Sequence, residues 1–328
     1  MRSRRLPAIL FAIAMLLTPR VSRGGDTADP QTESGAAAGE RPWSVHAATG
    51  FMYDSNVALD PSGQTIPGSP SDPRDGAYTI SVGGRYDIVD TDRWQASVEY
   101  DLYQALYFRL DDFNLRSNLA QATVGYALLP GELWTGVQAG YQHYALGGPS
   151  YSGEPFVTPF VSLVEGGWGL TQFLYRHGDL TYFNAFEDVR DGPDDSASLS
   201  QTIYWGAQYA SVGYEFGSVR PSSHSAAAND YRYYYNQGYV GVGWAPGWQV
   251  TVDVVYLFRY ENYTEPNSLT GFRTKRHDAI NQFSVGVRRP LTDHLTIGLN
   301  YYGTVDDSNI DVYTYDRNVV AAEVRFAY

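Results

Sequence analysis

Residue type alternates along most of this chain, from about Trp43 to Tyr328, and this alternation constrains the fold more than any other feature. Successive side chains of a β-strand point to opposite faces, so a segment with this pattern presents one apolar face and one polar face. In the last segment the apolar face consists of Val320, Ala322, Val324, Phe326 and Tyr328. The pattern predicts an all-β protein.

The alternating segments are joined by two kinds of connection. Short turns are expected at 90–92, 130–132, 166–167, 206–207, 245–247 and 291–293. Longer acidic loops, rich in glycine and proline, are expected at 54–74, 109–114, 147–153, 184–197, 220–230, 263–276 and 306–310. Short and long connections alternate without exception, which places all short turns at one end of the sheet. Outer-membrane barrels have this asymmetry, with short periplasmic turns and longer extracellular loops.

Tryptophan is concentrated at the short-turn end, whereas tyrosine accumulates toward the long loops. The 7 tryptophans are Trp43, Trp94, Trp134, Trp168, Trp205, Trp244 and Trp248. Amphipathic rings prefer the headgroup level of a bilayer, so aromatic belts at both strand ends are typical of a membrane barrel. Tryptophan and tyrosine are also common in the strands of soluble β-proteins. Strand propensity alone does not sort tryptophan to one end.

These observations predict an antiparallel up-and-down transmembrane β-barrel of about 14 strands. The expected strands are 43–53, 76–89, 93–108, 115–129, 133–146, 155–164, 168–183, 198–205, 209–219, 231–244, 248–262, 276–289, 294–305 and 311–328. An even number is expected because both termini should emerge on the periplasmic side. The region 198–219 is the least defined. A bulge instead of a turn at Gly206 would give 12 strands, and a hairpin hidden in a loop would give 16.

The N-terminal region predicts export. Residues 1–25 place arginines ahead of an apolar run that ends at Leu17, as in a secretory signal peptide. Residues 26–42 read as a flexible periplasmic lead-in, and residues 43–328 as the barrel. No other stretch approaches the ~20 apolar residues that a transmembrane helix needs. The chain has no cysteine, so disulfides and a lipid anchor are not expected. The predicted location is the bacterial outer membrane.

The charge of the chain argues against nucleic acid as a partner. The formal net charge is -13 at pH 7, and it becomes more negative once the arginines of the signal segment are removed. A polyanion would be repelled. The acidic loops would instead attract divalent cations that bridge lipopolysaccharide phosphates. Outer-membrane lipid and lipopolysaccharide are therefore the expected surroundings.

With the apolar faces turned to lipid, a mixed set of charged residues faces the barrel interior. The predicted pore-lining residues are Arg85, Asp87, Glu99, Asp101, Arg176, Glu215, Asp253, Arg259, Glu261, Arg288, Glu323 and Arg325. Such residues set ion preference when they line a channel. They form a salt-bridged filling when they pair with one another. Inward tyrosines, Tyr103, Tyr235, Tyr239 and Tyr302 among them, would narrow any channel.

Catalytic and metal-binding patterns are weak, and no catalytic residue, cofactor or metal is expected. The sequence has no G-x-S-x-G segment. His277-Asp278 and Asp306-Asp307 lie on neighbouring predicted strands and would be the candidate for activating a water molecule. The acidic run 187–195 lacks the spacing of a calcium loop and is expected to be a mobile, solvated loop. The chain is predicted not to be an enzyme.

Two segments carry a resemblance to known proteins. The segment Tyr53-Asp54-Ser55-Asn56-Val57 resembles the one that opens β-barrel porin-type proteins of Gram-negative bacteria, and a similar segment opens the barrel of surface lipoprotein assembly modifiers. The C-terminal Val324-Arg325-Phe326-Ala327-Tyr328 is similar to the aromatic-ended signature of outer-membrane proteins. The resemblance implies recognition by the barrel assembly machinery through the strand that ends at Tyr328. Assembly modifiers carry a helical-repeat domain before the barrel, and this chain has no room for one.

A porin-like channel for passive diffusion of small solutes or ions is the function that these features favour. Two alternatives remain, because one barrel fold carries many functions. The first is a barrel component of an envelope machine that exports polysaccharide or protein, with periplasmic partners. The second is a structural or adhesive barrel with a plugged lumen.

Overall fold

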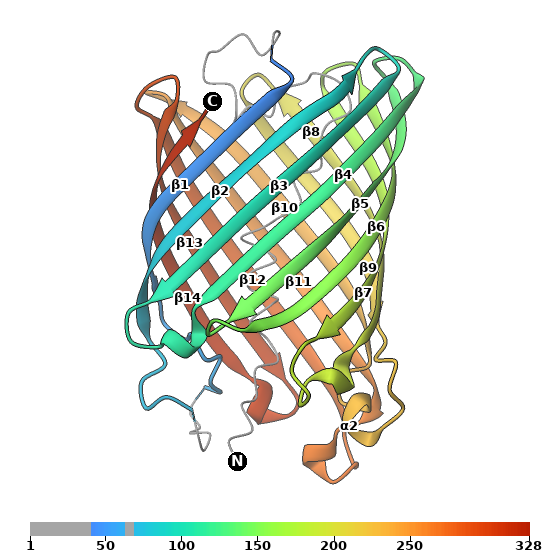
Figure 1. Ribbon diagram of the computed structural model, residues 1–328, viewed down its shortest axis with the longest axis vertical. Helices are drawn as coiled ribbons and strands as arrows, with labels where there is room; N and C mark the ends of the chain where they lie inside the picture. The colour runs from blue at the N-terminus through green and yellow to red at the C-terminus, as the bar shows by residue number, and fades with distance from the viewer. Residues whose placement is uncertain (1–40, 63–68) are drawn as a thin grey trace.

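The computed structural model describes residues 41–62 and 69–328. Fourteen strands form a closed antiparallel barrel in this part of the chain, with each strand paired to its sequence neighbours and β1 paired to β14 (Figure 1). The predicted signal peptide and nearly all of the lead-in 26–42 lie outside the described residues. The fold class and the strand number predicted from the sequence are confirmed.

The strands are β1 (Trp43–Asp54), β2 (Asp75–Asp90), β3 (Trp94–Tyr107), β4 (Leu115–Leu129), β5 (Leu133–Leu146), β6 (Ser150–Glu165), β7 (Gly169–Tyr182), β8 (Gly192–Trp205), β9 (Gln208–Val219), β10 (Tyr233–Gly247), β11 (Val250–Pro266), β12 (Lys275–Pro290), β13 (Leu295–Ser308) and β14 (Tyr315–Ala327). Short helices occur in the connections at the long-loop end: η1 (Asp111–Phe113), η2 (Asp188–Arg190), α2 (Ala226–Asn229), η3 (Ser268–Thr270) and η4 (Asp311–Tyr313). No helix of the described residues is long and apolar enough to cross a membrane.

The region around Gly206 is a turn and not a bulge. Trp205 of β8 pairs directly with Gln208 of β9, and Gly206 adopts the left-handed conformation with φ 65°. A residue without a side chain adopts this conformation readily. The turn therefore preserves two separate strands, which excludes the alternative of 12 strands in this region.

Several predicted connections are shorter or displaced in the structure. β6 begins at Ser150 and β8 at Gly192, so the loops expected at 147–153 and 184–197 are too long. The connection 147–149 is as short as the turns at the opposite end, and the predicted strict alternation of short and long connections is wrong at this point. The expected turn at 245–247 lies instead at Trp248 and Gln249, which have φ 53° and 58°. Two such residues form the favoured two-residue hairpin turn.

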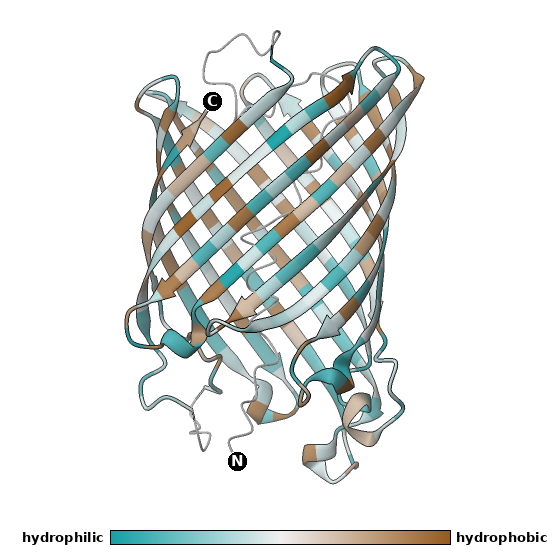
Figure 2. Cartoon of the chain, viewed as in Figure 1, coloured by the Kyte–Doolittle hydropathy of each residue, from teal (hydrophilic) through white to brown (hydrophobic). Residues whose placement is uncertain are grey.

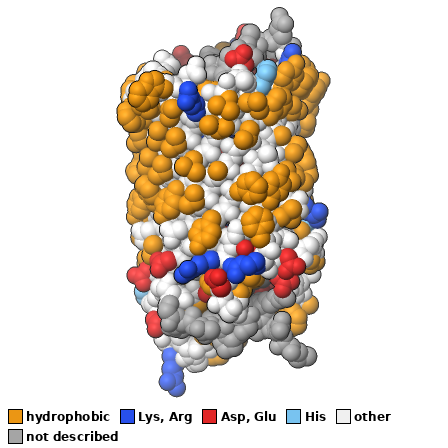
Figure 3. All heavy atoms as spheres, turned by 90° about the vertical axis from the view of Figure 1, so that its left-hand side faces the viewer, with side chains coloured by type: hydrophobic (Ala, Val, Ile, Leu, Met, Phe, Trp, Pro, Cys, Tyr) orange, Lys and Arg blue, Asp and Glu red, His pale blue; other side chains and the backbone are white. Residues whose placement is uncertain are grey.

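The outer face of the barrel is apolar and the inner face is polar or mixed. Hydropathy alternates along the strands in Figure 2. In Figure 3 apolar side chains cover the middle of the barrel, with a band of charged side chains near the long-loop end. A barrel that exposes this much apolar surface needs a lipid environment.

Six of the seven tryptophans are exposed, which agrees with a belt at the short-turn end. Trp134 is the exception, because it faces inward on β5 and is only 3% exposed. The prediction that all seven belong to one belt is therefore wrong for Trp134. Trp134 lies an even number of residues from the inward Gln142 and Tyr144 of the same strand. The alternation along β5 therefore predicts that Trp134 faces inward, although its nearness to a short turn had suggested the outer belt.

Outward tyrosines near the middle of five strands share a repeated hydrogen bond. In five hairpins an outward tyrosine hydroxyl donates to a side chain two residues closer to the long loop than its direct cross-strand partner. The pairs are Tyr100 to Asn118 (3.0 Å), Tyr175 to Asp195 (2.8 Å), Tyr214 to Asn236 (2.5 Å), Tyr256 to Asn281 (2.7 Å) and Tyr301 to Asn318 (2.7 Å). Each hydroxyl therefore has a polar partner although its ring lies on the apolar outer face, where an unpaired polar group would be costly.

The barrel closes between β1 and β14, and the Tyr53-Asp54-Ser55-Asn56-Val57 segment makes the closing contacts. The Nε–H of Arg317 on β14 is shared between both carboxylate oxygens of Asp54 at 3.1 Å, and Nη2 donates to the same carboxylate at 2.5 Å. The Asn318 amide donates to the Ser55 hydroxyl at 2.8 Å. Asn56 donates through Nδ2 to the carbonyls of Asp60 and Asp316. The residues that carry the resemblance are therefore those that join the first strand to the last.

Candidate channel lining

All twelve residues predicted to line a pore lie on the strand face opposite the exposed apolar side chains. Val98 and Tyr100 are exposed on either side of the part-buried Glu99, for example. Their inner position follows from strand parity. Their role in conduction stays a prediction.

Four of the predicted residues lie on β2 and β3 in the half of the barrel near the short turns. The Arg85 Nε donates to Asp87 at 2.8 Å. Glu99 accepts from the Gln121 amide at 3.0 Å. Asp101 lies 2.9 Å from the Nε2 of His46 on β1, and the two side chains meet over Gly83 of the intervening β2. The acids outnumber the arginines here, and each acid has a polar partner.

A second group lies on β11 and β12. The Arg288 Nη1 donates to Asp253 at 3.1 Å, and the Tyr209 hydroxyl donates to the same carboxylate at 3.0 Å. Glu323 of β14 extends toward this group, because a Cβ added at Gly298 would meet both Glu323 and Arg288. Arg325 follows two residues later on the same face.

A third group lies on β6 to β10. The Arg176 Nη2 donates to Glu154 at 2.8 Å, and its guanidinium lies 4.1 Å above the centre of the Phe156 ring. The Tyr235 hydroxyl donates to Glu215 at 2.7 Å. Arg176 and Glu215 were predicted from the sequence, whereas Glu154 was not.

The most buried charges form an arginine–tyrosine cluster at the long-loop end, on β11, β12 and β14. Arg259 donates to Glu261 at 2.8 Å and lies 3.6 Å above the Tyr235 ring. The second pair is Arg276 with Asp278, and the third is Arg317 with Asp54. Each of these arginines is less than 10% exposed. Buried charges are costly unless paired, so the ion pairs and the aromatic rings together keep these arginines inside the barrel.

A connecting loop contributes one further arginine to the same end. Arg190 of η2 donates to Glu187 at 2.9 Å, and its guanidinium lies 4.4 Å from the Tyr182 ring centre and 4.8 Å from that of Tyr231. Glu187 is buried. The expectation of a mobile, solvated loop at 187–195 is therefore wrong, because this loop packs inward and its last residues already belong to β8.

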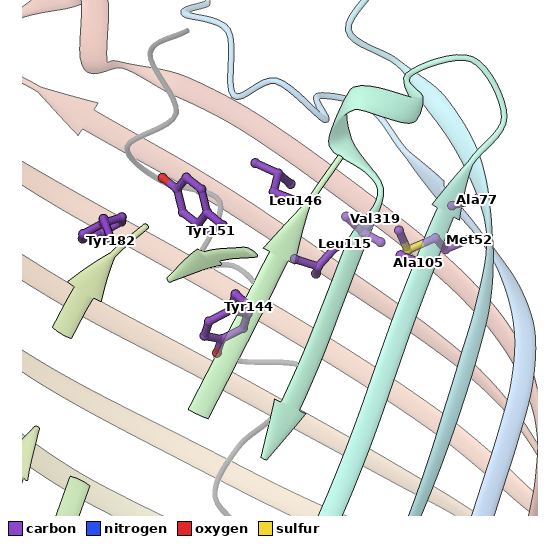
Figure 4. Packing of buried hydrophobic residues seen from close by; sticks show 9 residues of the cluster. All are labelled: Met52, Ala77, Ala105, Leu115, Tyr144, Leu146, Tyr151, Tyr182 and Val319. Atoms are coloured by element: carbon purple, nitrogen blue, oxygen red, sulfur yellow. The ribbon is translucent and has the colours of Figure 1, made fainter. Parts of the chain in front are cut away.

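An apolar cluster lies beside the arginine–tyrosine cluster, inside the same end of the barrel. It consists of Met52, Ala77, Ala105, Leu115, Tyr144, Leu146, Tyr151, Tyr182 and Val319 (Figure 4). Tyr103 and Tyr302, two of the tyrosines expected to narrow the lumen, pack against it. The long-loop end is thus the more densely filled part of the described barrel.

The candidate hydrolytic pair is not assembled. Asp278 and Asp306 are buried and face inward, whereas His277 and Asp307 are exposed on the outer face. His277 shares the outer face with Asp307, whereas Asp278 and Asp306 lie on the inner side of the wall, so the four residues do not come together in one site. The described residues also contain no group of His, Asp and Glu side chains that could hold a metal ion. That the chain is not an enzyme stays a prediction.

Several inward charges were missed by the sequence analysis, namely Asp54, Asp75, Glu154, Asp194, Arg276, Asp278, Asp306 and Arg317. Most of them lie at strand ends that were expected to be loops, since charged residues next to glycine and proline resemble connections. Arg276, Asp278 and Arg317 lie within predicted strands and share parity with Arg288 or Glu323. The alternation that identified the other charges would have found these three.

Comparison with protein-family models and with curated protein sequences finds no match. Solved structures do match. The outer membrane channel DcaP of Acinetobacter baumannii has a TM-score of 0.51 at 9% identity, over 87% of this chain and 97% of DcaP. A loop L8 deletion mutant of OmpT, an outer membrane protein of Vibrio cholerae, has a TM-score of 0.48 at 9% identity, over 87% and 98%. The chain has the fold of outer-membrane β-barrel channels, and at these identities the likeness concerns the fold alone.

Proposed function

We propose that this protein is an outer-membrane channel through which small solutes or ions diffuse passively. The observation that carries the proposal is the contrast between the two faces of a closed barrel. The outer face is apolar and edged by aromatic residues, whereas the inner face bears charged groups at both the short-turn end and the long-loop end. Charged groups on the wall of a lumen attract ions, and a wall with a net charge favours ions of the opposite sign.

The proposed preference is for cations. Near the short turns, Asp87, Glu99 and Asp101 outnumber Arg85, and Asp253 adds a carboxylate across the barrel. The excess of acids on the inner face supports a negative lumen potential.

Single-channel recording in a planar bilayer tests the proposal. The refolded barrel is expected to give discrete conductance steps, and a salt gradient is expected to give a reversal potential of the sign that indicates cation preference. The triple variant E99Q/D101N/D253N keeps side-chain size and removes three charges, so the reversal potential should move toward zero while conductance persists.

The matched control is the variant D90N/D92N, in which Asp90 is the exposed last residue of β2 and Asp92 lies in the first short turn. It should leave the reversal potential close to wild type. Silence from folded protein would contradict the proposal and would favour a plugged barrel or a component of an export machine. A reversal potential that the triple variant leaves unchanged would remove these three residues from the conduction path.

A further inference from the structure

The inner surface of the barrel has two unlike walls. In the described residues β4 and β5 carry no inward charged side chain, since Arg116 and His143 face outward. The inward charges of β11 to β14 are Asp253, Arg259, Glu261, Arg276, Asp278, Arg288, Asp306, Arg317, Glu323 and Arg325. In the strand order β4 and β5 lie halfway around the barrel from β11 and β12, so the uncharged wall faces the charged wall.

The uncharged wall is lined by aromatic rings that continue onto β6. A Cβ added at Gly140 would lie 2.7 Å from the Phe156 ring, and one added at Gly136 would lie 2.5 Å from the Phe160 ring. The rings therefore lie directly over glycine backbone of β5. Trp134 lies beside Phe160, since both approach Gly125 to 3.8 Å by the same measure. Trp134 and Phe156 are buried, and the Arg176 guanidinium lies 4.1 Å above the Phe156 ring, so Phe160 is the part-buried ring through which this wall meets the lumen.

The strand that carries these two phenylalanines is interrupted on its other side. The pairing of β6 with β7 has gaps at Glu154 and Pro155 and again at Thr158 and Pro159, whereas the pairing of the same four residues with β5 is continuous. Proline has no N–H to donate, so a proline within a sheet removes one hydrogen bond of the ladder. The β6–β7 junction therefore lacks backbone hydrogen bonds at two places, next to Phe156 and next to Phe160.

These two prolines differ from the others in the described strands. The remaining strand prolines, Pro193, Pro246, Pro266 and Pro290, lie within one residue of a strand end. Pro155 and Pro159 lie inside β6 with exposed, outward side chains. An unsatisfied backbone group in hydrocarbon costs free energy, and closed barrels normally avoid it. A junction that already lacks these bonds loses less when its strands separate.

We propose that the β6–β7 junction is a lateral opening through which small apolar solutes pass between the lumen and the membrane. The Phe160 ring leads to the junction beside Pro159, and the prolines lower the cost of separating the strands. Separation also requires the 2.8 Å ion pair between Arg176 of β7 and Glu154 of β6 to break. The solute class is neutral and apolar, with a flat ring of the size that a phenylalanine side chain can stack on. This inference rests on the proposed channel function, because the solute enters through the lumen.

Restoring the missing donors tests the opening. The variant P155V/P159V supplies two backbone N–H groups to β7, and two added hydrogen bonds make strand separation rarer by about tenfold. The probe is N-phenyl-1-naphthylamine, an apolar ring compound that fluoresces in membranes, added to vesicles with lipopolysaccharide in the outer leaflet. Its entry rate should fall by about that factor, while KCl conductance in a planar bilayer stays at the wild-type value. The variant P266V/P290V, with the same exchange at strand ends, should leave both quantities unchanged.

A reversible crosslink provides a second test that does not depend on proline. Ser162 and Gln172 are paired across β6 and β7, and their side chains are joined by a 3.2 Å hydrogen bond. Because the chain has no cysteine, S162C/Q172C creates a single disulfide. Oxidation should stop protein-dependent entry of the probe without changing KCl conductance, and reduction should restore entry.

The outcomes separate the two proposals. A wild-type barrel that conducts KCl but does not accelerate probe entry would overturn the lateral opening and leave the channel intact. Probe entry that persists in both the oxidised S162C/Q172C protein and P155V/P159V would overturn it as well, and would assign the prolines to the shape of β6 alone. Absence of KCl conductance from the folded wild-type barrel would instead contradict the channel function itself.

Discussion

Asp54 connects the first strand of the barrel to the last. It is fully buried and accepts hydrogen bonds from Arg317 and from the Tyr107 hydroxyl, the latter at 3.1 Å. Its partners lie on β14 and β3, so the carboxylate connects three strands across the closing junction. Removing one member of a buried ion pair leaves the other charge without compensation.

We predict that Asp54→Asn lowers the free energy of unfolding by about 3–5 kcal/mol, because Arg317 stays buried without a counter-charge. Urea unfolding in detergent micelles, followed by tryptophan fluorescence, measures this change. The double variant D54N/R317Q should recover part of the loss. Asp316→Asn is the control, since Asp316 is exposed and its carboxylate accepts a 3.1 Å hydrogen bond from the Ser62 hydroxyl. Equal stability of D54N and D316N would contradict the assignment.

At the scale of single residues, sequence parity placed the charged groups on the correct face but did not pair them. Asp101 and Glu99 lie two residues apart on β3, yet their partners are His46 on β1 and Gln121 on β4. Each partner depends on the register between strands, and register is not encoded in the parity of one strand. The sequence could predict which charged residues face inward, whereas it could not predict which side chains they contact.

The hairpins explain where the prediction of elements succeeded and where it failed. Strands with apolar outward faces, such as β4 and β5, were predicted with correct bounds. β8 was predicted six residues too short, since its start, Gly192 to Ala197, reads as an acidic loop. In the structure Gly192 pairs with Leu180 of β7 and Asp194 pairs with Val219 of β9. Pairing with both neighbouring strands keeps this segment extended, although glycine, proline and aspartate have a low intrinsic preference for β-strands.

The positions of the connections predict which sites are accessible from outside an intact cell. Ser222 lies in the β9–β10 connection at the long-loop end, and Asp92 lies in the β2–β3 turn at the opposite end. The chain has no cysteine, so S222C and D92C each introduce one reactive thiol. A membrane-impermeant maleimide should label S222C on intact cells and should label D92C only after the outer membrane is permeabilised. The reverse pattern would contradict the proposed orientation.

At the scale of the whole molecule, the barrel is closed by contacts between its first strand and the C-terminal residue. Val45 and Tyr328 exchange two backbone hydrogen bonds of 2.9 Å. The Tyr328 ring lies 5.6 Å from the ring of Trp43, and the Arg41 guanidinium lies 4.4 Å above it. The last residue therefore extends the closing ladder by one step. The same residue ends the segment through which we expect the barrel assembly machinery to recognise the chain.

Deletion of Tyr328 should reduce the fraction of chains that reach the folded barrel, because two backbone hydrogen bonds at about 1 kcal/mol each are lost with the ring contacts. The heat-modifiable band of the membrane fraction on a gel measures folded barrel. Tyr328→Phe keeps the backbone bonds and the ring, and it should remain close to wild type. A full yield of folded barrel from the deletion variant would show that closure does not need this residue.

The sequence by itself determined the class of fold, the number of strands, the end that carries the short turns and the face of each strand that meets the interior. These properties follow from a local period of two residues and from the strand length that a bilayer requires. Only the tertiary structure decided which charges are paired, how the long-loop end is filled and where the ladder between strands is interrupted. Asp54 and Arg317, for instance, are separated by 263 positions in the chain. Contacts of that range arise from closure of the barrel, and a pattern within one strand carries no record of them.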